Sequence, residues 1–389
     1  MKKLWLLFAQ AATVAVATLF VVTTLKPEWL AATREAAPAP VVVQQAAPQR
    51  EAAAKAASYS DAVAKAAPAV VYIFTSGTAR GSRHAVPDDP VFRRFFGDSL
   101  EDPRGPRLGS GVIVSTKGYL LTNNHVVEGM EEIEVLLADG KTRLKAKLVG
   151  TDPETDLAVL KVDRENLPAV AFGTPGSVRV GDVVLAIGNP FGVGQTVTMG
   201  IVSGLGRRGL NLNTYENFIQ TDASINVGNS GGALIDAAGN LIGINTAIFS
   251  RTGGSVGIGF AIPVSTAKAV LEQIVEQGGV TRGYIGVQTQ GVSSEVAEAL
   301  RTAKTSGVLI AGVERDGPAE KAGVKAGDVL VAVNAVPTPD TATMLDTVAD
   351  LKPGTQASLK LRRDQKDIDL QVTVGKRPAV RERRRGARE

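Results

Sequence analysis

The sequence predicts a mostly β protein with two folded domains, and three observations support this prediction. Short runs rich in Val and Ile alternate with glycine turns over residues 69–263, a pattern typical of a sheet sandwich or barrel. A second series of strand-like runs begins at residue 282 and includes segments with helical spacing. The length of 389 residues provides enough chain for both domains and for linkers.

The first segment, 1–27, is expected to be a membrane anchor or a signal sequence. Lys2 and Lys3 precede an apolar run over 4–25. A helix of that length spans roughly the 30 Å of the hydrocarbon layer, and the lysines favour a cytoplasmic amino end. Small residues just after the run are also compatible with removal of the segment as a cleaved signal peptide. Residues 28–57, rich in Ala, Pro and Gln, are expected to form a linker.

The larger β domain is expected at 58–263, and a linker helix at 264–281. Within Val264–Gln277, five apolar residues follow helical spacing. Ser265 is expected to be the N-cap of this helix and Gly278 to end it. The helix would close the first domain and lead into the second.

The smaller domain is expected at 282–376. A helical pattern over 341–351 precedes an alternating pattern over 359–374 that is typical of a hairpin. The remaining residues, 377–389, are rich in Arg and are expected to form a basic disordered tail. Contact of this tail with nucleic acid or anionic lipid is the alternative interpretation, and we expect no nucleic-acid partner.

The composition excludes several classes of site. The chain has no cysteine, which excludes disulfides, thiolate zinc sites and cysteine nucleophiles. It has two histidines, His84 and His125, too few for a three-histidine metal site within one chain. There is no GxxxxGK[ST] run, so nucleotide binding is not indicated. We therefore expect no metal and no cofactor.

Three motifs together predict nucleophilic catalysis. His125 lies in TNNHVV, Asp152 and Asp156 lie in TDPETDLAVL, and Ser230 lies in QTDASINVGNSGGAL. A serine hydroxyl needs a base within hydrogen-bond reach, and histidine is suited to that role when an acidic group orients it. Asp152 competes with Asp156 for the orienting role. We favour Asp156 because it directly precedes an apolar strand that would fix its position.

The glycines around Ser230 predict an oxyanion hole. A tetrahedral intermediate needs preorganised donors, and glycines let backbone N–H groups converge. The N–H groups of Gly228 and Ser230 are the candidates. The chain order His, Asp, Ser matches the chymotrypsin arrangement. Each motif alone has a structural explanation, but the three together, in this order, argue against those explanations.

These motifs, with IGNPFGVGQTVTMGIVSGLGR and GIGFAIP, resemble those of the HtrA (Deg) family of serine proteases from about residue 58 onward. The smaller domain resembles a PDZ domain, which captures an extended peptide by strand addition. Anchor, protease and one PDZ domain are similar to the DegS and AlgW type. The resemblance implies a chymotrypsin-like double β-barrel for the larger domain, an α+β fold for the PDZ domain, a homotrimer, and a catalytic triad of His125, Asp156 and Ser230.

The resemblance also implies further site residues. Arg207 matches an arginine that couples PDZ occupancy to the active site, although the adjacent Arg208 makes the assignment ambiguous. An apolar S1 pocket would favour small or medium aliphatic residues before the cleaved bond. Its expected lining is Ile225, Phe249 and Ile258, and the expected carboxylate-binding loop of the PDZ domain is Tyr284, Ile285, Gly286 and Val287.

Three functions are compatible with these features. In the first, a protease with its domains in the bacterial periplasm is held by a single-pass inner-membrane anchor. Its PDZ domain binds exposed C-termini of misfolded outer-membrane proteins, and it cleaves an anti-sigma factor-like membrane protein in an envelope stress response. The second is a general periplasmic quality-control protease and chaperone that degrades unfolded proteins. The third is an inert binding scaffold, which the intact triad argues against.

Overall fold

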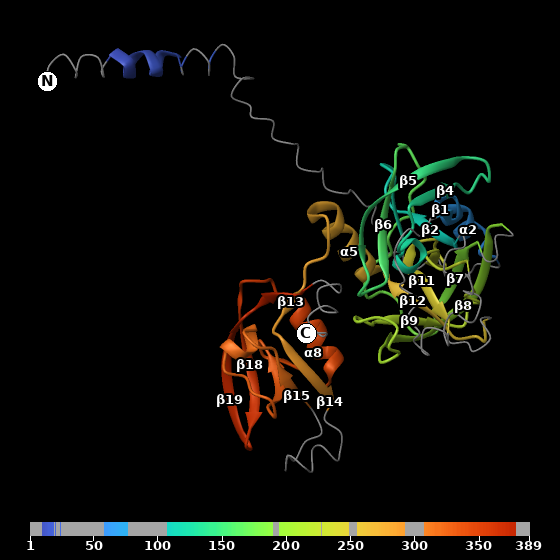
Figure 1. The fold of residues 1–389 in the computed structure, drawn as a ribbon. Helices are drawn as coiled ribbons and strands as arrows, with labels where there is room; N and C mark the ends of the chain where they lie inside the picture. Colours follow the sequence, from blue (N-terminus) through green and yellow to red (C-terminus); the bar gives the residue numbers. More distant parts are fainter. Residues whose placement is uncertain are drawn as a thin grey trace. The chain divides into compact units, whose positions relative to one another are not determined.

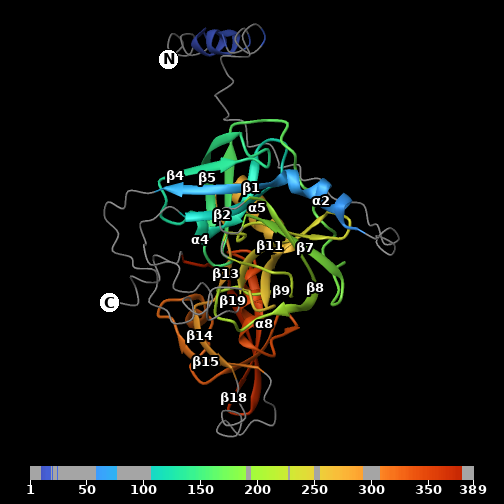
Figure 2. The ribbon, with the colours of Figure 1, turned by 90° about the vertical axis from the view of Figure 1, so that its right-hand side faces the viewer.

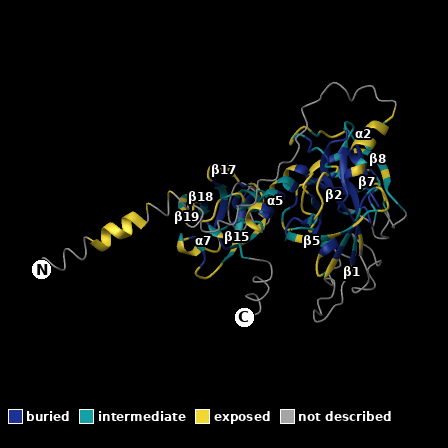
Figure 3. Cartoon of the chain, turned by 90° about the horizontal axis from the view of Figure 1, so that it is seen from above, coloured by how far each residue is buried: buried dark blue, intermediate teal, exposed yellow. Residues whose placement is uncertain are grey.

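The computed structural model describes residues 10–18, 20, 24, 58–76, 107–189, 194–226, 228–248, 255–291 and 307–378. Residues 10–18 are helical with exposed side chains, drawn yellow in Figure 3. Within these described ranges, no helix is both long and apolar enough to cross a membrane. The expected linker 28–57 and most of the expected anchor lie outside the described residues.

Six antiparallel strands close the first barrel (Figure 1). A helix, α2 (Ser60–Ala66), and a 3₁₀ turn, η3 (Ala67–Ala69), precede its first strand, and both are visible beside β1 in Figure 2. The β-branched and apolar residues of these strands alternate between the barrel interior and its outer face. In barrel order, the strands are β1 (Val70–Ser76), β2 (Arg107–Ile113), β3 (Tyr119–Asn123), β6 (Leu157–Val162), β5 (Arg143–Asp152) and β4 (Glu132–Leu136).

Six further antiparallel strands close a second barrel. The double β-barrel expected from the family resemblance is thus confirmed. The strand pattern alone was compatible with a sandwich or a barrel, and the described strands form barrels. In barrel order, the strands are β10 (Ala233–Asp236), β11 (Leu241–Ile248), β12 (Gly259–Pro263), β9 (Phe218–Thr221), β8 (Thr196–Arg207) and β7 (Val183–Gly188).

One hydrophobic core runs through both barrels. It joins Leu121 and Leu160 of the first barrel to Ile187 and Ile235 of the second, all of them fully buried. The strands of this part of the chain are mostly dark blue in Figure 3. Because burial of apolar surface is the main favourable term in folding, the shared core holds the two barrels against each other and fixes the loops between them.

The linker helix α5 (Val264–Gln277) begins directly where β12 ends. The expectation that Ser265 caps it is wrong: Pro263 occupies the N-cap position, and Ser265 lies inside the helix. Gly278 ends the helix in the left-handed conformation with φ 74°, as expected. The buried face of α5 includes Ile274, which lies so close to Gly150 of β5 that a Cβ there would be 2.8 Å away.

In residues 282–291 and 307–376, the smaller domain contains antiparallel strands and two short helices. Its sheet has the path β14 (Val287–Gly291), β15 (Val308–Val313), β16 (Val329–Val333), β18 (Gln356–Arg363), β19 (Lys366–Thr373), with β17 (Val336–Pro337) beside β16. The expected hairpin is β18–β19. The chain enters and leaves the domain through a two-stranded pair, β13 (Gly283–Tyr284) and β20 (Gly375–Lys376). The helices are α7 (Pro318–Lys321) and α8 (Thr341–Ala349).

Candidate active site

The pairing of β3 with β6 brings the histidine and aspartate motifs together. Asn123, the last residue of β3, is opposite Leu157, the first residue of β6. A short helix, α4 (Asn124–Val127), begins immediately after β3. His125 on this helix therefore lies beside Asp156, which directly precedes β6.

Asp156 accepts two hydrogen bonds from the histidine. Its Oδ2 is 2.7 Å from the Nδ1 of His125, and its Oδ1 accepts from the backbone N–H of His125 at 2.9 Å. Two contacts to one carboxylate fix the orientation of the imidazole ring.

The backbone of Asp156 has φ 60°, a left-handed conformation that is unusual for a residue other than glycine. Its carbonyl oxygen accepts from the side-chain amide of Asn123 at 3.0 Å and from the N–H of Asn124 at 3.1 Å. These contacts stabilise a conformation that costs roughly 1–2 kcal/mol. Asn123 was not predicted to belong to the site.

Thr246 on β11 is a second site residue that sequence reasoning missed. Its hydroxyl donates to Oδ2 of Asp156 at 2.9 Å, and its carbonyl accepts from the hydroxyl of Ser230 at 3.2 Å. In the sequence, Thr246 lies 90 residues from Asp156. No motif joins the two, and only the hairpin formed by β10 and β11 places Thr246 near Ser230.

The turn that carries Ser230 is held by backbone hydrogen bonds. The N–H of Gly231 donates to the carbonyl of Asn245 at 2.8 Å, and the N–H of Gly232 donates to the carbonyl of Asn229 at 2.9 Å. Gly231 has φ 81°, and a Cβ there would lie 2.2 Å from the carbonyl oxygen of Ser110. A glycine at position 231 is therefore required both by conformation and by space.

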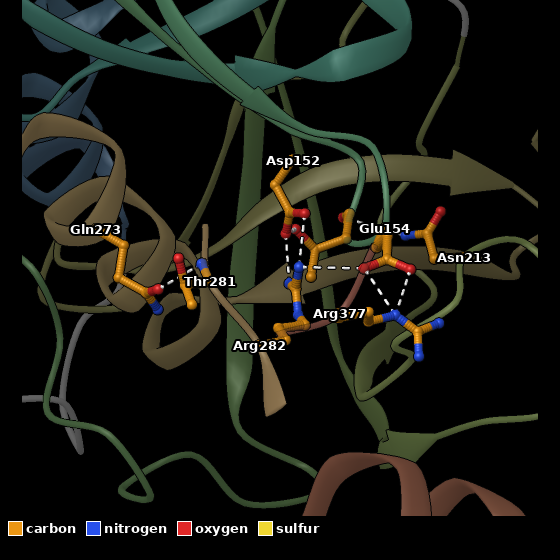
Figure 4. Close-up of polar contacts among 8 residues, drawn as sticks. Asp152, Glu154, Asn213, Gln273, Thr281, Arg282 and Arg377 are labelled. Carbon is orange, nitrogen blue, oxygen red and sulfur yellow. Dashed lines mark hydrogen bonds and ion pairs between the residues drawn. The ribbon is translucent and has the colours of Figure 1, made fainter. Parts of the chain in front are cut away.

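Asp152, the competing acid, is bound elsewhere. It forms a bidentate ion pair with Arg282, in which Nη1 is 2.8 Å from Oδ1 (Figure 4). Burial alone would lower the pKa of Arg282, but the hydrogen bond and the charge of Asp152 outweigh it, so the pKa lies above its ordinary value. The geometry thus joins Asp156, and not Asp152, to His125.

A second ion pair adjoins the first. Arg377 donates to Glu154 at 2.9 Å, and Arg282 lies 3.5 Å from the same carboxylate (Figure 4). The ring of Tyr215 lies under both guanidinium groups, 4.4 Å from the carbon of Arg282 and 5.4 Å from that of Arg377. The four charged side chains are each 12% exposed or less. We call Asp152, Glu154, Arg282 and Arg377 the clasp.

The clasp connects the end of β5 and the turn that precedes Asp156 to both ends of the smaller domain. Asp152 is the last residue of β5, Glu154 lies in the turn between β5 and β6, and Arg282 and Arg377 flank β13 and β20. Arg377 was expected to lie in the basic disordered tail, but its side chain is buried in the clasp.

The two candidate regulatory arginines have different partners. Nε of Arg207 donates to Oε1 of Gln220 at 2.8 Å, across β8 and β9. Arg208 instead pairs with Asp346 of α8, with 2.7 Å between Nη2 and Oδ2. Arg208 therefore contacts the smaller domain.

The expected S1 residues are only partly described. Ile225 is 1% exposed and lies against Gly259, where a Cβ would be 2.6 Å from its Cγ1. Ile258, the neighbour of Gly259, is half-buried. Phe249 lies outside the described residues, so the pocket stays a prediction.

The expected carboxylate-binding loop has a conformation suited to that role. Gly286 has φ 76° between the buried Ile285 and Val287, the first residue of β14. In the described part of the sheet, β14 pairs with β15 and is the first strand of the path. Such an edge accepts an added strand. The hydroxyl of Tyr284 donates to Glu314 at 2.9 Å beside the loop.

Comparison with known proteins identifies both domains. The trypsin-like peptidase domain family matches residues 109–244, and the PDZ domain family matches residues 283–374. The chain is 47% identical over 316 residues to a probable periplasmic serine endoprotease DegP-like of Brucella suis; the match covers 75% of this chain and 61% of that protein, which is less than two thirds. It is 45% identical over 312 residues to the periplasmic pH-dependent serine endoprotease DegQ of Escherichia coli, covering 79% of this chain and 68% of that one.

Solved structures are similar as well. The HtrA-type protease AlgW with decapeptide aligns with a TM-score of 0.72 and 53% identity, covering 83% of this chain and 99% of that one. A serine endoprotease from Yersinia pestis aligns with a TM-score of 0.64 and 40% identity, covering 83% and 100%. The chain therefore belongs to the HtrA family of serine proteases, with a trypsin-like peptidase domain followed by a PDZ domain.

Proposed function

We propose that this protein is a serine endopeptidase in which Ser230 is the nucleophile, His125 the general base and acid, and Asp156 the orienting acceptor. One observation carries the proposal: the carboxylate that contacts the Nδ1 of His125 at 2.7 Å is joined through Thr246 to the hydroxyl of Ser230. The family membership of the chain supports the same roles.

The reaction follows from these positions. The hydroxyl of Ser230 turns from the carbonyl of Thr246 toward the Nε2 of His125, gives up its proton there, and attacks the peptide carbonyl. The negative charge on that carbonyl oxygen is stabilised by the N–H groups of Gly228 and Ser230. The imidazolium then protonates the leaving amine. Water, deprotonated by the same imidazole, hydrolyses the acyl ester and restores the serine.

We propose that a bound peptide regulates this activity. In this proposal the exposed C-terminus of a misfolded outer-membrane protein pairs with the β14 edge, and its carboxylate binds at Tyr284, Ile285, Gly286 and Val287. Two contacts support communication with the active site: the clasp adjoins the turn of Asp156, and Arg208 binds Asp346 on α8. Such a protease is a two-state system biased by a ligand.

In this proposal the protein works in the bacterial periplasm as a homotrimer, held at the inner membrane by residues 1–27. Its substrate is an anti-sigma factor-like membrane protein, so that cleavage signals envelope stress. The names of the Brucella and Escherichia coli relatives, both called periplasmic, support the compartment. The second candidate is a general periplasmic quality-control protease, which the DegP-like and DegQ names favour.

The experiment measures peptidase activity of the full chain with and without peptides that end in a free carboxylate. Strong stimulation that disappears when the peptide terminus is amidated supports the gated protease. High activity without peptide supports the quality-control protease instead. Ser230→Ala is the inactive control in both cases.

A pair of variants tests the choice of acid. Asp156→Asn is expected to lower kcat by about 10⁴-fold, the size of effect seen when the orienting acid of such a triad loses its charge. Asp152→Asn is expected to retain far more activity. The assignment is wrong if the folded Asp152→Asn protein is the more impaired of the two.

A further inference from the structure

Ser110 of β2 contacts both ends of the turn that carries the nucleophile. It belongs to the first barrel and is fully buried. Its backbone N–H donates to the carbonyl of Ser230 at 2.9 Å, and its hydroxyl donates to the carbonyl of Gly228 at 2.8 Å. One residue thus holds the two residues whose N–H groups are proposed to form the oxyanion hole.

The side chain and backbone of Ser110 are themselves held from two other directions. Its hydroxyl oxygen accepts from the N–H of Asn189 at 3.0 Å, just after β7. Its carbonyl oxygen accepts from the hydroxyl of Thr122 on β3 at 2.7 Å. Because the donor and acceptor functions of the hydroxyl are both used, its orientation is determined.

The orientation of a carbonyl determines the orientation of the N–H in the same peptide unit, since the two point in opposite directions. The bond from Ser110 fixes the carbonyl of Gly228, which shares its peptide unit with the N–H of Asn229, and that N–H donates to the carbonyl of Asn226 at 3.1 Å. This peptide unit lies between the two units that carry the N–H groups of Gly228 and Ser230. The bond from Gly232 fixes the carbonyl of Asn229, and thereby aims the N–H of Ser230 to the opposite side. Gly228 has φ 102°, and a glycine rotates more freely than any other residue. Without an anchor, its peptide units have several orientations available.

We propose that Ser110 is a positioning residue for the oxyanion hole: its hydroxyl fixes the peptide unit between Gly228 and Asn229, and the N–H groups of Gly228 and Ser230, in the two neighbouring units, thereby converge on the substrate oxygen. This inference rests on the proposed function, which assigns the hole to those two N–H groups. Ser110 touches no reacting atom and acts through the turn.

Loss of the hydroxyl would affect two groups at once. In Ser110→Ala, the carbonyl of Gly228 and the N–H of Asn189 both lose a partner at a site that solvent does not reach. A buried group without a partner favours rearrangement. Of the two groups that lose a partner, the carbonyl of Gly228 is the one that belongs to a glycine, whose backbone rotates most readily. The consequence is a turn that still carries Ser230 but presents its donors less well.

The experiment compares Ser110→Ala and Ser110→Cys with Ser115→Ala in the full chain. Ser115 is a matched control because its hydroxyl is also buried in the first barrel, where it accepts from the N–H of Lys117. The cysteine variant has a thiol, a weaker hydrogen-bond donor, in place of the hydroxyl. Because the natural chain has no cysteine, this substitution introduces a single thiol. We measure kcat, KM, the inhibition constant of a peptide boronate, labelling by a fluorophosphonate, and the thermal unfolding midpoint.

Ser110→Ala is expected to lower kcat by about 10- to 100-fold, less than the roughly 100- to 1,000-fold loss from deleting an oxyanion donor. KM is expected to change by less than about twofold, and the boronate, which forms a tetrahedral adduct, is expected to bind more weakly by the same factor as kcat. The kcat of Ser110→Cys is expected to lie between that of the unsubstituted protein and that of Ser110→Ala. Ser115→Ala is expected to retain the original kcat.

Two results would overturn the inference. The first is a kcat for Ser110→Ala that equals the kcat of the unsubstituted protein. The second is an equal loss of kcat in Ser110→Ala and Ser115→Ala when both lower the unfolding midpoint by the same amount. If Ser110→Ala does not fold, Ser110→Cys decides: a native midpoint with undiminished kcat rejects the inference. Failure of the proposed function is seen separately, as an unsubstituted protein without Ser230-dependent fluorophosphonate labelling, and it removes this inference as well.

Discussion

The hydroxyl of Thr246 donates to the same carboxylate oxygen of Asp156 that contacts the Nδ1 of His125, at distances of 2.9 and 2.7 Å. Thr246 lies in the second barrel, and Asp156 lies in the first. The acid of the proposed triad is therefore oriented from both barrels, and the active site depends on their shared core.

Replacement of Thr246 by valine is expected to lower kcat by about 10-fold with little effect on KM. Valine has the same shape but cannot donate, so the carboxylate loses one of the bonds that fix it. Steady-state peptidase kinetics measure the effect, and Thr246→Ser, which keeps the hydroxyl, is the control. An equal loss in the serine and valine variants would contradict the role given to the hydroxyl.

The clasp is expected to show strong coupling in a double-mutant cycle. Arg377→Met removes the nearer of the two arginines from the buried carboxylate of Glu154, at an expected cost of roughly 3 kcal/mol in the free energy of unfolding. Glu154→Gln in the same chain is expected to recover part of that loss, because no buried charge is then left uncompensated. Chemical denaturation of the four proteins in the cycle measures the coupling, and simple additivity would count against the clasp.

Asp346 is expected to reduce stability at neutral pH. Burial raises the pKa of its carboxyl; Arg208 opposes the shift, and the charges of Asp350 and Asp340 reinforce it. Between the ordinary carboxyl pKa and this raised value, the folded state binds more protons than the unfolded state, so stability falls as pH rises through that window. Asp346→Asn is therefore expected to unfold at a higher temperature than the unsubstituted protein at pH 7.

The difference between the two proteins is expected to shrink on acidification and to vanish below about pH 3, where Asp346 is protonated in both the folded and the unfolded state. Asp139 provides a control of opposite sign. Hydrogen bonds from the Thr142 side chain and from backbone N–H groups lower its pKa to about 2. Asp139→Asn is expected to be the less stable protein at pH 7, and that difference is lost as pH falls toward 2. Unfolding midpoints measured across pH distinguish the two signs.

Gly286→Ala is expected to weaken binding of peptides with a free C-terminus by about 10-fold. A left-handed conformation costs alanine roughly 1–2 kcal/mol, and the added Cβ would lie 3.1 Å from Oε2 of Glu314. The loop would relax and its N–H groups would turn away from the carboxylate. Fluorescence anisotropy with a labelled peptide measures the affinity. Gly291→Ala is the control, because that Cβ would meet no atom within 4 Å.

Much of the fold was predictable because it depends on local patterns. The helix Val264–Gln277 has one apolar face and a glycine at its end, and the hairpin of β18 and β19 shows a strict alternation of side chains. The start of that helix was not predictable from Ser265. The strand before it runs to Pro263, whose ring fixes a conformation suited to a helix entrance.

The sequence by itself determined which residues are available for catalysis: one histidine in a strand-end motif, one serine among glycines, and two candidate aspartates. Only the tertiary structure decided between the aspartates, because β3 pairs with β6 in a register that places Asp156 against His125, while Arg282 binds Asp152. Thr246 and Ser110 were not predictable for the same reason. Their contacts join strands far apart in the chain, and such contacts are determined by barrel closure and not by local sequence.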